Sequence, residues 1–254
     1  MKPIVIKNTA LGEGIPKICV PIVARTQAEA VTQAQEIVLL KEEQAVDLVE
    51  WRADWMNGVE DWENCLAAAK AVRAILADLP LLFTIRTRPE GGEQDIPQET
   101  YLQLTEKAAQ SGLFDLVDVE LSAGEENIKR ILHTAHANGV YVIASNHDFH
   151  STPAREELLS RLTKMDVLGA DILKIAVMPQ CADDVLTLLS ATEEMSRRTE
   201  KPLITMSMSV KGAISRLSGE VFGSCMTFGT AKQASAPGQI SAVQLKEILN
   251  LLHG

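Results

Sequence analysis

Short, nearly continuous apolar runs recur along the chain and alternate with longer amphipathic segments. Runs of this kind, rich in Val, Ile, Leu, Phe and Thr, are typical of parallel strands that are covered on both faces. They predict strands at residues 17–24, 47–53, 81–87, 116–121, 140–145, 172–177, 203–208 and 224–229.

The segments between these runs carry apolar residues at helical spacing. Thr26 is a suitable N-cap for the first of them, and Gly112 ends the third. Helices are therefore predicted at residues 26–44, 64–78, 96–112, 126–139, 153–169, 182–198 and 241–253, with a shorter one near 214–220.

Eight strand–helix units in 254 residues match the α/β class and, within it, the TIM (β/α)8 barrel. An open doubly wound sheet is the competing arrangement, but no G-x-G-x-x-G fingerprint follows the first strand. No linker or low-complexity segment divides the chain, so residues 1–254 are predicted to form a single catalytic domain. Residues 1–16 precede the barrel, and "PIVIK" (3–7) is expected to form a β segment that caps the barrel bottom.

The composition of the chain limits the kinds of molecule that the protein could bind and indicates where in the cell it would be found. The formal net charge, 24 − 34 = −10, argues against nucleic acid as the main partner, although a local arginine cluster can still bind an anionic small molecule. The four cysteines form no C-x-x-C pair and have no zinc-ligand spacing, which indicates buried or half-buried thiols in a reducing cytosol. Neither a signal peptide nor a membrane-spanning apolar run is evident, so the protein is predicted to be cytoplasmic.

One charged residue interrupts the predicted strand at 172–177. Lys174 stands in the middle of "DILKIAV" (171–177), and a lysine is almost never fully buried unless something pairs with it. A single lysine at such a position can also extend its amine to the barrel mouth, so Lys174 alone does not define a site.

Other polar side chains stand at the carboxyl ends of the predicted strands, where TIM barrels place their chemistry. The candidates are Glu50, Arg52, Asp54, Arg86, Glu90, Asp118, Glu120, His147, Lys174, Met206 and Met208, followed by Arg216, Ser235 and Gln239 in the last two loops. Some of these residues could have a purely structural role instead. Glu50 and Arg52 could form an ion pair at the barrel rim, and the two methionines could fill the core. His147 and His150 beside Asp148 suggest a metal, but the sequence shows no third ligand. The concentration of these side chains at one end of a barrel favours a site for a carboxylated or polyhydroxylated small molecule.

The chemistry that this set supports is that of a Schiff base. Burial disfavours the charged form of a lysine, and a neutral amine attacks a ketone or aldehyde to form an imine. The imine acidifies the neighbouring C–H bond, so that a histidine can take that proton and return one to a leaving hydroxyl. A glutamate would orient the imidazole and arginines would pair with a carboxylate, while the loop that carries Ser235 and Gln239 would close as a lid.

These segments together resemble the type I 3-dehydroquinate dehydratases, the Schiff-base dehydroquinases of the shikimate pathway. The resemblance rests on "EWRAD" (50–54), "FTIRTRPEGGEQ" (83–94), "SNHDFHSTP" (145–153), "ADILKIAVMPQ" (170–180), "ITMSMSVKGAISRLSGEVFGS" (204–224) and "KQASAPGQIS" (232–241). It implies a hydro-lyase that dehydrates 3-dehydroquinate to 3-dehydroshikimate by syn elimination of water.

The same resemblance implies a role for each candidate residue. Lys174 would form the Schiff base, His147 would be the general base and acid, and Glu90 would support His147. The implied substrate-binding residues are Glu50, Arg52 and Arg86 for the ring hydroxyls, Arg216 with Ser235 and Gln239 for the carboxylate, and Met206 and Met208 as apolar contacts. The family also implies no metal, no organic cofactor and a homodimer.

Two other functions remain open at this level. A class I aldolase or transaldolase would share Lys174, but it would not need this arrangement of arginine, glutamate and histidine, and such enzymes usually act on phosphorylated sugars. A non-catalytic barrel that binds sugar acids would be expected to lose the lysine or the histidine, and this chain has both.

Overall fold

The structure, a computed structural model, describes residues 2–231 and 240–253. Its strands are β1 (Ile4–Ile6), β2 (Thr9–Leu11), β3 (Lys17–Ile22), β4 (Leu48–Arg52), β5 (Leu81–Thr84), β6 (Leu116–Glu120), β7 (Tyr141–Asp148), β8 (Ile172–Val177), β9 (Leu203–Ser207), β10 (Met226–Thr230) and β11 (Ile240–Ser241). A strand coincides with each of the eight predicted apolar runs. The short strands β2 and β11 were not predicted.

Helices follow the barrel strands in the predicted order. They are α1 (Gln27–Glu42), α2 (Trp62–Leu76), α3 (Gln98–Gln110), α4 (Glu125–Ala137), α5 (Arg155–Leu168), α6 (Ala182–Arg198), α7 (Ala213–Leu217), α8 (Gly219–Phe222) and α9 (Ala242–His253), with single 3-10 turns η1 (Ala53–Trp55), η2 (Arg88–Glu90) and η3 (Leu121–Ala123). Thr26 caps α1 as predicted, because its hydroxyl accepts a hydrogen bond from the backbone N–H of Glu29 at 3.2 Å.

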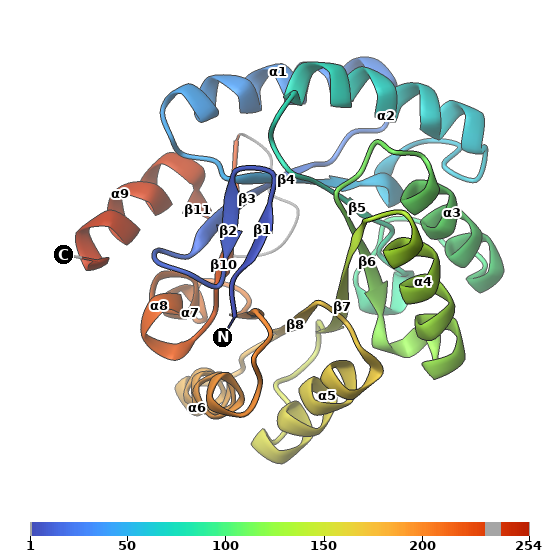
Figure 1. The fold of residues 1–254 in the computed structure, drawn as a ribbon. Coiled ribbons are helices and arrows are strands. Elements are labelled where there is room, and N and C mark those ends of the chain that lie inside the picture. The colour runs from blue at the N-terminus through green and yellow to red at the C-terminus, as the bar shows by residue number, and fades with distance from the viewer. Residues whose placement is uncertain (1, 232–239, 254) are drawn as a thin grey trace.

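The parallel strands β3 to β10 form a closed ring with the helices outside it (Figure 1). On one side β10 pairs with β3, and on the other Leu203 of β9 forms a parallel bridge with Ser224, just before β10. The backbone N–H of Cys225 donates to the carbonyl oxygen of Leu203 at 2.8 Å across this last gap. The barrel prediction is therefore confirmed, and the open doubly wound sheet is wrong.

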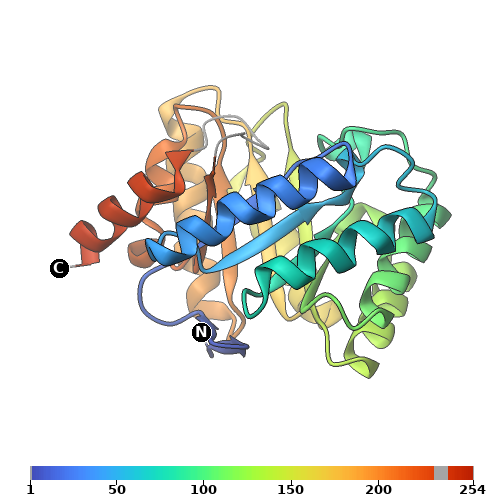
Figure 2. The same cartoon turned by 90° about the horizontal axis from the view of Figure 1, so that it is seen from above.

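The N-terminal segment closes one end of the barrel. It forms the antiparallel hairpin β1–β2, which lies across the barrel axis in Figure 1 and beyond one end of the barrel in Figure 2. Ile6 and Leu11 of this hairpin are buried against inward-facing residues at the starts of the strands, which are Cys19, Leu48, Leu82, Leu116, Ile143, Ile172, Ile204 and Met226. The predicted β cap is therefore present, and it makes the bottom of the barrel an apolar plug.

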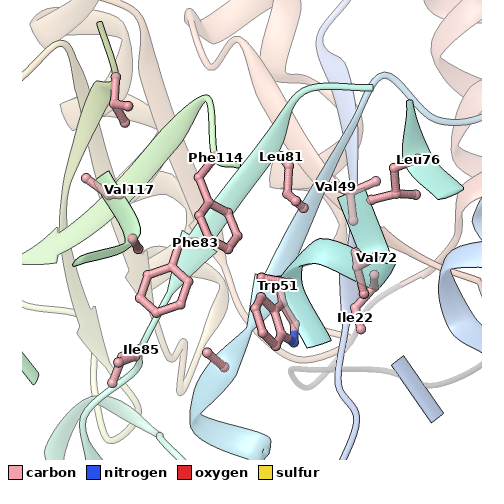
Figure 3. Packing of buried hydrophobic residues seen from close by; sticks show 14 of the residues in the cluster. Ile22, Val49, Trp51, Val72, Leu76, Leu81, Phe83, Ile85, Phe114 and Val117 are labelled. Atoms are coloured by element: carbon pink, nitrogen blue, oxygen red, sulfur yellow. The ribbon is translucent and has the colours of Figure 1, made fainter. Parts of the chain in front are cut away.

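The outer face of the sheet is equally apolar. Trp51, Phe83 and Phe114 lie together outside β4 and β5 (Figure 3). The rings of Trp51 and Phe114 stack at 5.9 Å between centroids, and Phe83 meets Phe114 edge-on at 5.0 Å. Because successive side chains of a strand point to opposite faces, this packing directs the intervening residues, such as Glu50 and Arg52, into the barrel.

A short pattern recurs at the starts of β4, β6 and β8. The sequences are "DLVEW" (47–51), "DLVDV" (115–119) and "DILKI" (171–175). Each aspartate accepts a backbone hydrogen bond at 2.8 Å from the start of the preceding strand: Asp47 from Ile18, Asp115 from Leu81, and Asp171 from Val142. These contacts fix the alternate strands at the same height, so the residues three positions after each aspartate lie in one layer of the barrel.

One cysteine departs from the prediction. Cys19, Cys65 and Cys225 are buried as expected, whereas Cys181 is exposed because it occupies the N-cap position of α6 at the surface. Within residues 2–231 and 240–253, no helix is long and apolar enough to cross a membrane.

Candidate active site

Lys174 lies inside the barrel with its amine surrounded by side chains from other strands. It is 3% exposed, and its Nζ is 3.6 Å from Oε1 of Glu50 and 3.7 Å from Oδ2 of Asp118. The ring of Phe228 lies below the amine, 4.7 Å from Nζ to the centroid, which is a cation–π distance. The charged groups closest to this amine are therefore carboxylates from strands β4 and β6.

Glu50, Asp118, Lys174 and Phe228 come from β4, β6, β8 and β10, which are alternate strands of the barrel. TIM barrels build their interior from such layers of four side chains. The layer nearer the hairpin is apolar. This layer instead contains two carboxylates, a lysine amine and an aromatic ring.

Arg86 ties several carboxylates together beside this layer. Its guanidinium donates to Oδ1 of Asp118 at 2.9 Å and to Oε1 of Glu120 at 2.8 Å. It also donates to the hydroxyl of Ser145 at 3.1 Å. Burial would lower the pKa of Arg86, but Asp118 and Glu120 outweigh it and hold the pKa above its ordinary value. Arg86 is therefore a permanent positive charge inside the site.

Arg52 is held in a fixed orientation at the same end of the barrel. Its Nε and Nη2 each donate to one oxygen of Asp54 at 2.8 Å, in a bidentate pair. Burial opposes the charge of Arg52, but Asp54 outweighs it and raises the pKa. The same carboxylate accepts the backbone N–H groups of Arg86 at 3.2 Å and Glu93 at 3.1 Å, so Asp54 also fixes the loop after β5.

Glu90, which is buried, and His147, which is half-buried, form a pair at the rim of the site. Oε2 of Glu90 accepts from the backbone N–H of His147 at 2.8 Å and lies 3.0 Å from its Nδ1. With Nδ1 occupied by this contact, Nε2 is the nitrogen left for a substrate. Burial and the nearby charge of Glu120 raise the pKa of Glu90 to about 7, against the lowering effect of Arg86. Burial, followed by the positive charges of Arg86 and Lys174, lowers the pKa of His147 well below its usual range, so the imidazole is neutral at pH 7.

Glu90 reaches His147 because the two following residues are glycines. Gly91 has φ +89°, and a Cβ atom there would lie 2.3 Å from the ring of Phe149. A Cβ atom on Gly92 would lie 1.9 Å from the carbonyl oxygen of Arg86. The "EGGE" sequence is thus a requirement of close packing, and the loop cannot hold Glu90 in place with larger residues.

Replacing Gly92 by alanine is expected to destabilise the protein by about 3 kcal/mol, because the new methyl group overlaps a backbone oxygen. It should also lower kcat, since the displaced loop carries Glu90. Urea unfolding and steady-state kinetics test both effects. Gly112→Ala is the control, because a Cβ atom there has no neighbour within 4 Å and only its φ of +70° is unfavourable. Equal stability of the two variants would contradict the packing argument.

These side chains line one pocket at the mouth of the barrel, whose empty volume of about 440 Å³ includes space open to solvent. The lining residues are Glu50, Arg52, Arg86, Glu90, His147, Phe149, Lys174, Ala176, Met206, Met208 and Phe228. The predicted residues among them are thus brought together. Phe149, Ala176 and Phe228 were missed, although Ala176 and Phe228 alternate with inward-facing neighbours on their own strands.

Arg216 is placed beside the pocket by α7. It is 1% exposed, and its Nη1 lies 3.7 Å from the sulfur of Met206, which lines the pocket. Burial lowers the pKa of Arg216 to about 10, so the guanidinium remains charged at pH 7. The predicted residues Ser235 and Gln239 lie outside the described residues.

The contacts of Asp148 do not support the metal site that the sequence suggested at His147, Asp148 and His150. Its Oδ1 accepts from the backbone N–H groups of His150 at 2.9 Å and Ser151 at 2.8 Å, so the carboxylate closes the turn after β7. The described part of the chain contains no group of three or more His, Cys, Asp or Glu side chains that could hold a metal ion.

The fold and the pocket together define a class: a (β/α)8-barrel enzyme whose pocket presents a buried lysine amine and a neutral histidine. Comparison with known proteins narrows this class. A sequence model described as type I 3-dehydroquinase matches residues 18–254. This chain therefore belongs to the type I 3-dehydroquinase family, and the prediction of a carbon–oxygen lyase is confirmed.

Individual relatives agree with this assignment along the whole chain. The 3-dehydroquinate dehydratase of Listeria innocua is 52% identical over 253 residues, covering 100% of this chain and 99% of its own. A solved type I 3-dehydroquinate dehydratase from Clostridium difficile, described as carrying covalently modified comenic acid, superposes with a TM-score of 0.95 at 48% identity and covers 100% and 99% of the two chains. The enzyme from Geobacillus kaustophilus gives 0.95 at 40% identity, with 99% and 96% covered.

Proposed function

We propose that this chain dehydrates 3-dehydroquinate to 3-dehydroshikimate through a Schiff base between Lys174 and the substrate ketone. The observation that carries the proposal is the buried amine of Lys174, which lies between two carboxylates in the pocket that also contains His147. Membership of the type I family and the full-length similarity to 3-dehydroquinate dehydratases support the choice of substrate.

The carboxylates around Lys174 fit the charge balance of imine formation. An ammonium and a ketone give a protonated imine and one water, so the nitrogen carries one positive charge before and after the step. The amine must give up a proton transiently in order to attack the carbonyl carbon. Oδ2 of Asp118 is buried and has no hydrogen-bond partner among the described residues, which suits it to accept that proton. Glu50 and Asp118 then stabilise the iminium as they do the ammonium.

His147 supplies the elimination. Its neutral imidazole removes a proton from the carbon next to the iminium. The C–H electrons form a new C=C bond while the C=N π electrons move to the nitrogen, which gives an enamine. The enamine electrons then expel the hydroxyl group on the next carbon, which takes the proton from the imidazolium and leaves as water. One group that acts on a single face gives syn elimination. Water then hydrolyses the iminium, which releases the product and restores Lys174.

The remaining residues would bind and orient the ring. Glu50, Arg52 and Arg86 are assigned to the hydroxyl groups, and the immobilised guanidiniums of the two arginines support this role. Arg216 is assigned to the carboxylate, together with Ser235 and Gln239. Met206 and Met208 are assigned to the apolar edge of the ring, which their place in the pocket lining supports. A homodimer stays a prediction from the family, and sedimentation of the purified chain tests it.

Borohydride trapping tests the covalent step. The protein is incubated with 3-dehydroquinate and sodium borohydride, which reduces an iminium to a stable secondary amine, and the modified residue is mapped by mass spectrometry. The adduct is expected on Lys174, with Lys201 unmodified as an internal control. A protein that dehydrates the substrate without any adduct on Lys174 would refute the Schiff-base mechanism.

Arg216→Met is expected to raise KM by roughly 100-fold, because it removes a charged, fork-shaped partner of the substrate carboxylate while nearly preserving side-chain volume. The value of kcat should change much less, since Arg216 does not contact the reacting bonds in this scheme. Steady-state kinetics against 3-dehydroquinate provide the measurement, with the exposed Arg197→Met as the matched control. An unchanged KM removes the carboxylate role from Arg216.

A further inference from the structure

A surface serine reaches the buried end of the Glu90–His147 pair. Ser122 lies in η3, directly after β6, and is exposed. Its hydroxyl is nevertheless 3.1 Å from Oε1 of Glu90 and 3.2 Å from Oε2 of Glu120. Glu90 is 5% exposed and Glu120 is fully buried. Ser122 therefore connects two buried carboxylates to the outside of the barrel.

The two oxygens of Glu90 face opposite environments. Oε2 contacts His147, on the side of the catalytic pocket. Oε1 faces outward and accepts from Ser122 and from Nδ2 of Asn146, the latter at 3.2 Å. Asn146 is itself oriented by Arg161 of α5, whose Nη1 donates to its Oδ1 at 2.8 Å. Glu90 is thus held from behind by two donors that the catalytic scheme does not use.

These donors open onto a groove between η3 and α5, outside the barrel. Ser122, Asn146, Arg161 and Lys164 contribute to its walls, and its empty volume is about 610 Å³. Among the described residues, none lines both this groove and the catalytic pocket. Water in the groove can therefore reach Ser122 without passing through the substrate site.

The charges around Glu90 make its ionisation sensitive to these donors. Arg86 is 3.9 Å away and favours the carboxylate, while Glu120 opposes it. Glu120 has strong donors of its own, because it accepts from Arg86 and from the backbone N–H of Thr87, both at 2.8 Å. His147 faces Glu90 from β7, and Arg161 acts through Asn146. Glu120 thus keeps these donors when the hydroxyl of Ser122 is lost, whereas Oε1 of Glu90 keeps the side-chain amide of Asn146 as its donor.

We propose that Ser122 is a positioning residue for the catalytic base: its hydroxyl donates to Glu90 from the outer groove, keeps that carboxylate ionised beside Glu120, and thereby keeps Glu90 able to stabilise the imidazolium of His147. This inference rests on the proposed role of His147, and it concerns the base alone and not the formation of the imine.

The test is the pH profile of kcat/KM for Ser122→Ala. Loss of the donor raises the pKa of Glu90, so the acid limb is expected to move to higher pH by about half a unit or more. Ser122→Thr retains a hydroxyl and should restore the wild-type profile. Ser160→Ala removes another hydroxyl from the same groove, on α5, and should leave the profile unchanged.

Two results would overturn the proposal: a Ser122→Ala profile that superposes on the wild type, or a shift that Ser160→Ala reproduces. Borohydride trapping on Lys174 keeps this question separate from the proposed function. Trapping is expected at wild-type yield in Ser122→Ala. If the wild type itself gave no adduct, the Schiff-base mechanism would fail, whatever the serine variants showed.

Discussion

Replacing Lys174 by methionine is expected to lower kcat by a factor on the order of 10⁴ or more, because the nucleophile that forms the imine is lost. Methionine is similar to lysine in length and leaves the pocket filled. No borohydride adduct should form. The variant should also be less stable by about 3 kcal/mol, since Glu50 and Asp118 lose the ammonium between them. Turnover assays, mass spectrometry and thermal unfolding provide the three measurements.

Lys201→Met is the matched control for this variant. Lys201 precedes β9 at the opposite end of the barrel, and its amine is 3.2 Å from Asp166. The same chemical change there should leave kcat and trapping unaltered. A Lys174→Met protein that retains its fold by circular dichroism and still turns over at the wild-type rate would contradict the mechanism.

His147→Ala should separate the two halves of the reaction. Imine formation needs the amine of Lys174 and the carboxylates beside it, so trapping on Lys174 is expected to persist. Dehydration should slow by about 10²–10⁴-fold, the usual contribution of a general base. The measurements are the trapped fraction by mass spectrometry and the appearance of the conjugated product by absorbance.

His150→Ala provides the comparison for His147→Ala. His150 is exposed, follows His147 by three residues and does not line the pocket. Its loss should affect neither trapping nor dehydration. If both histidine variants dehydrated equally fast, the base would have to be another group, and Glu90 would be the first to examine because it contacts His147.

The strands and helices were predictable because each barrel strand is covered on both faces. Such strands are apolar over nearly their full length, and the run at 172–177 coincides with β8 residue for residue. The polar positions were informative for the same reason, because a charged residue in a doubly covered strand needs a partner or a function. Only the first strand of the hairpin was predicted. The second, β2, is three residues long and only one of them, Leu11, is buried, so it leaves no apolar run in the sequence.

The contacts within the site could not be predicted from the sequence to the same extent. The sequence placed Lys174 among several strand-end charges without showing which lie closest, and the structure shows that the nearest are Glu50 and Asp118. Asp118 was recognised as a strand-end carboxylate without a role. Ser122 gave no signal, because a serine in a surface turn is unremarkable until its distance to Glu90 is known. Each of these facts depends on residues that are brought together across the barrel.

The sequence by itself determined the order of strands and helices, the barrel, and the lysine, histidine and glutamate around which the chemistry is proposed. The tertiary structure alone decided what surrounds Lys174. Three aspartates at the barrel bottom set β4, β6 and β8 at one height, and the alternation of side chains then directs Glu50, Asp118 and Lys174 into one layer. Residues separated by dozens of positions meet there because each layer of a closed barrel takes its side chains from alternate strands. This arrangement depends on how the strands are placed in space, and the spacing of the residues along the chain does not reveal it.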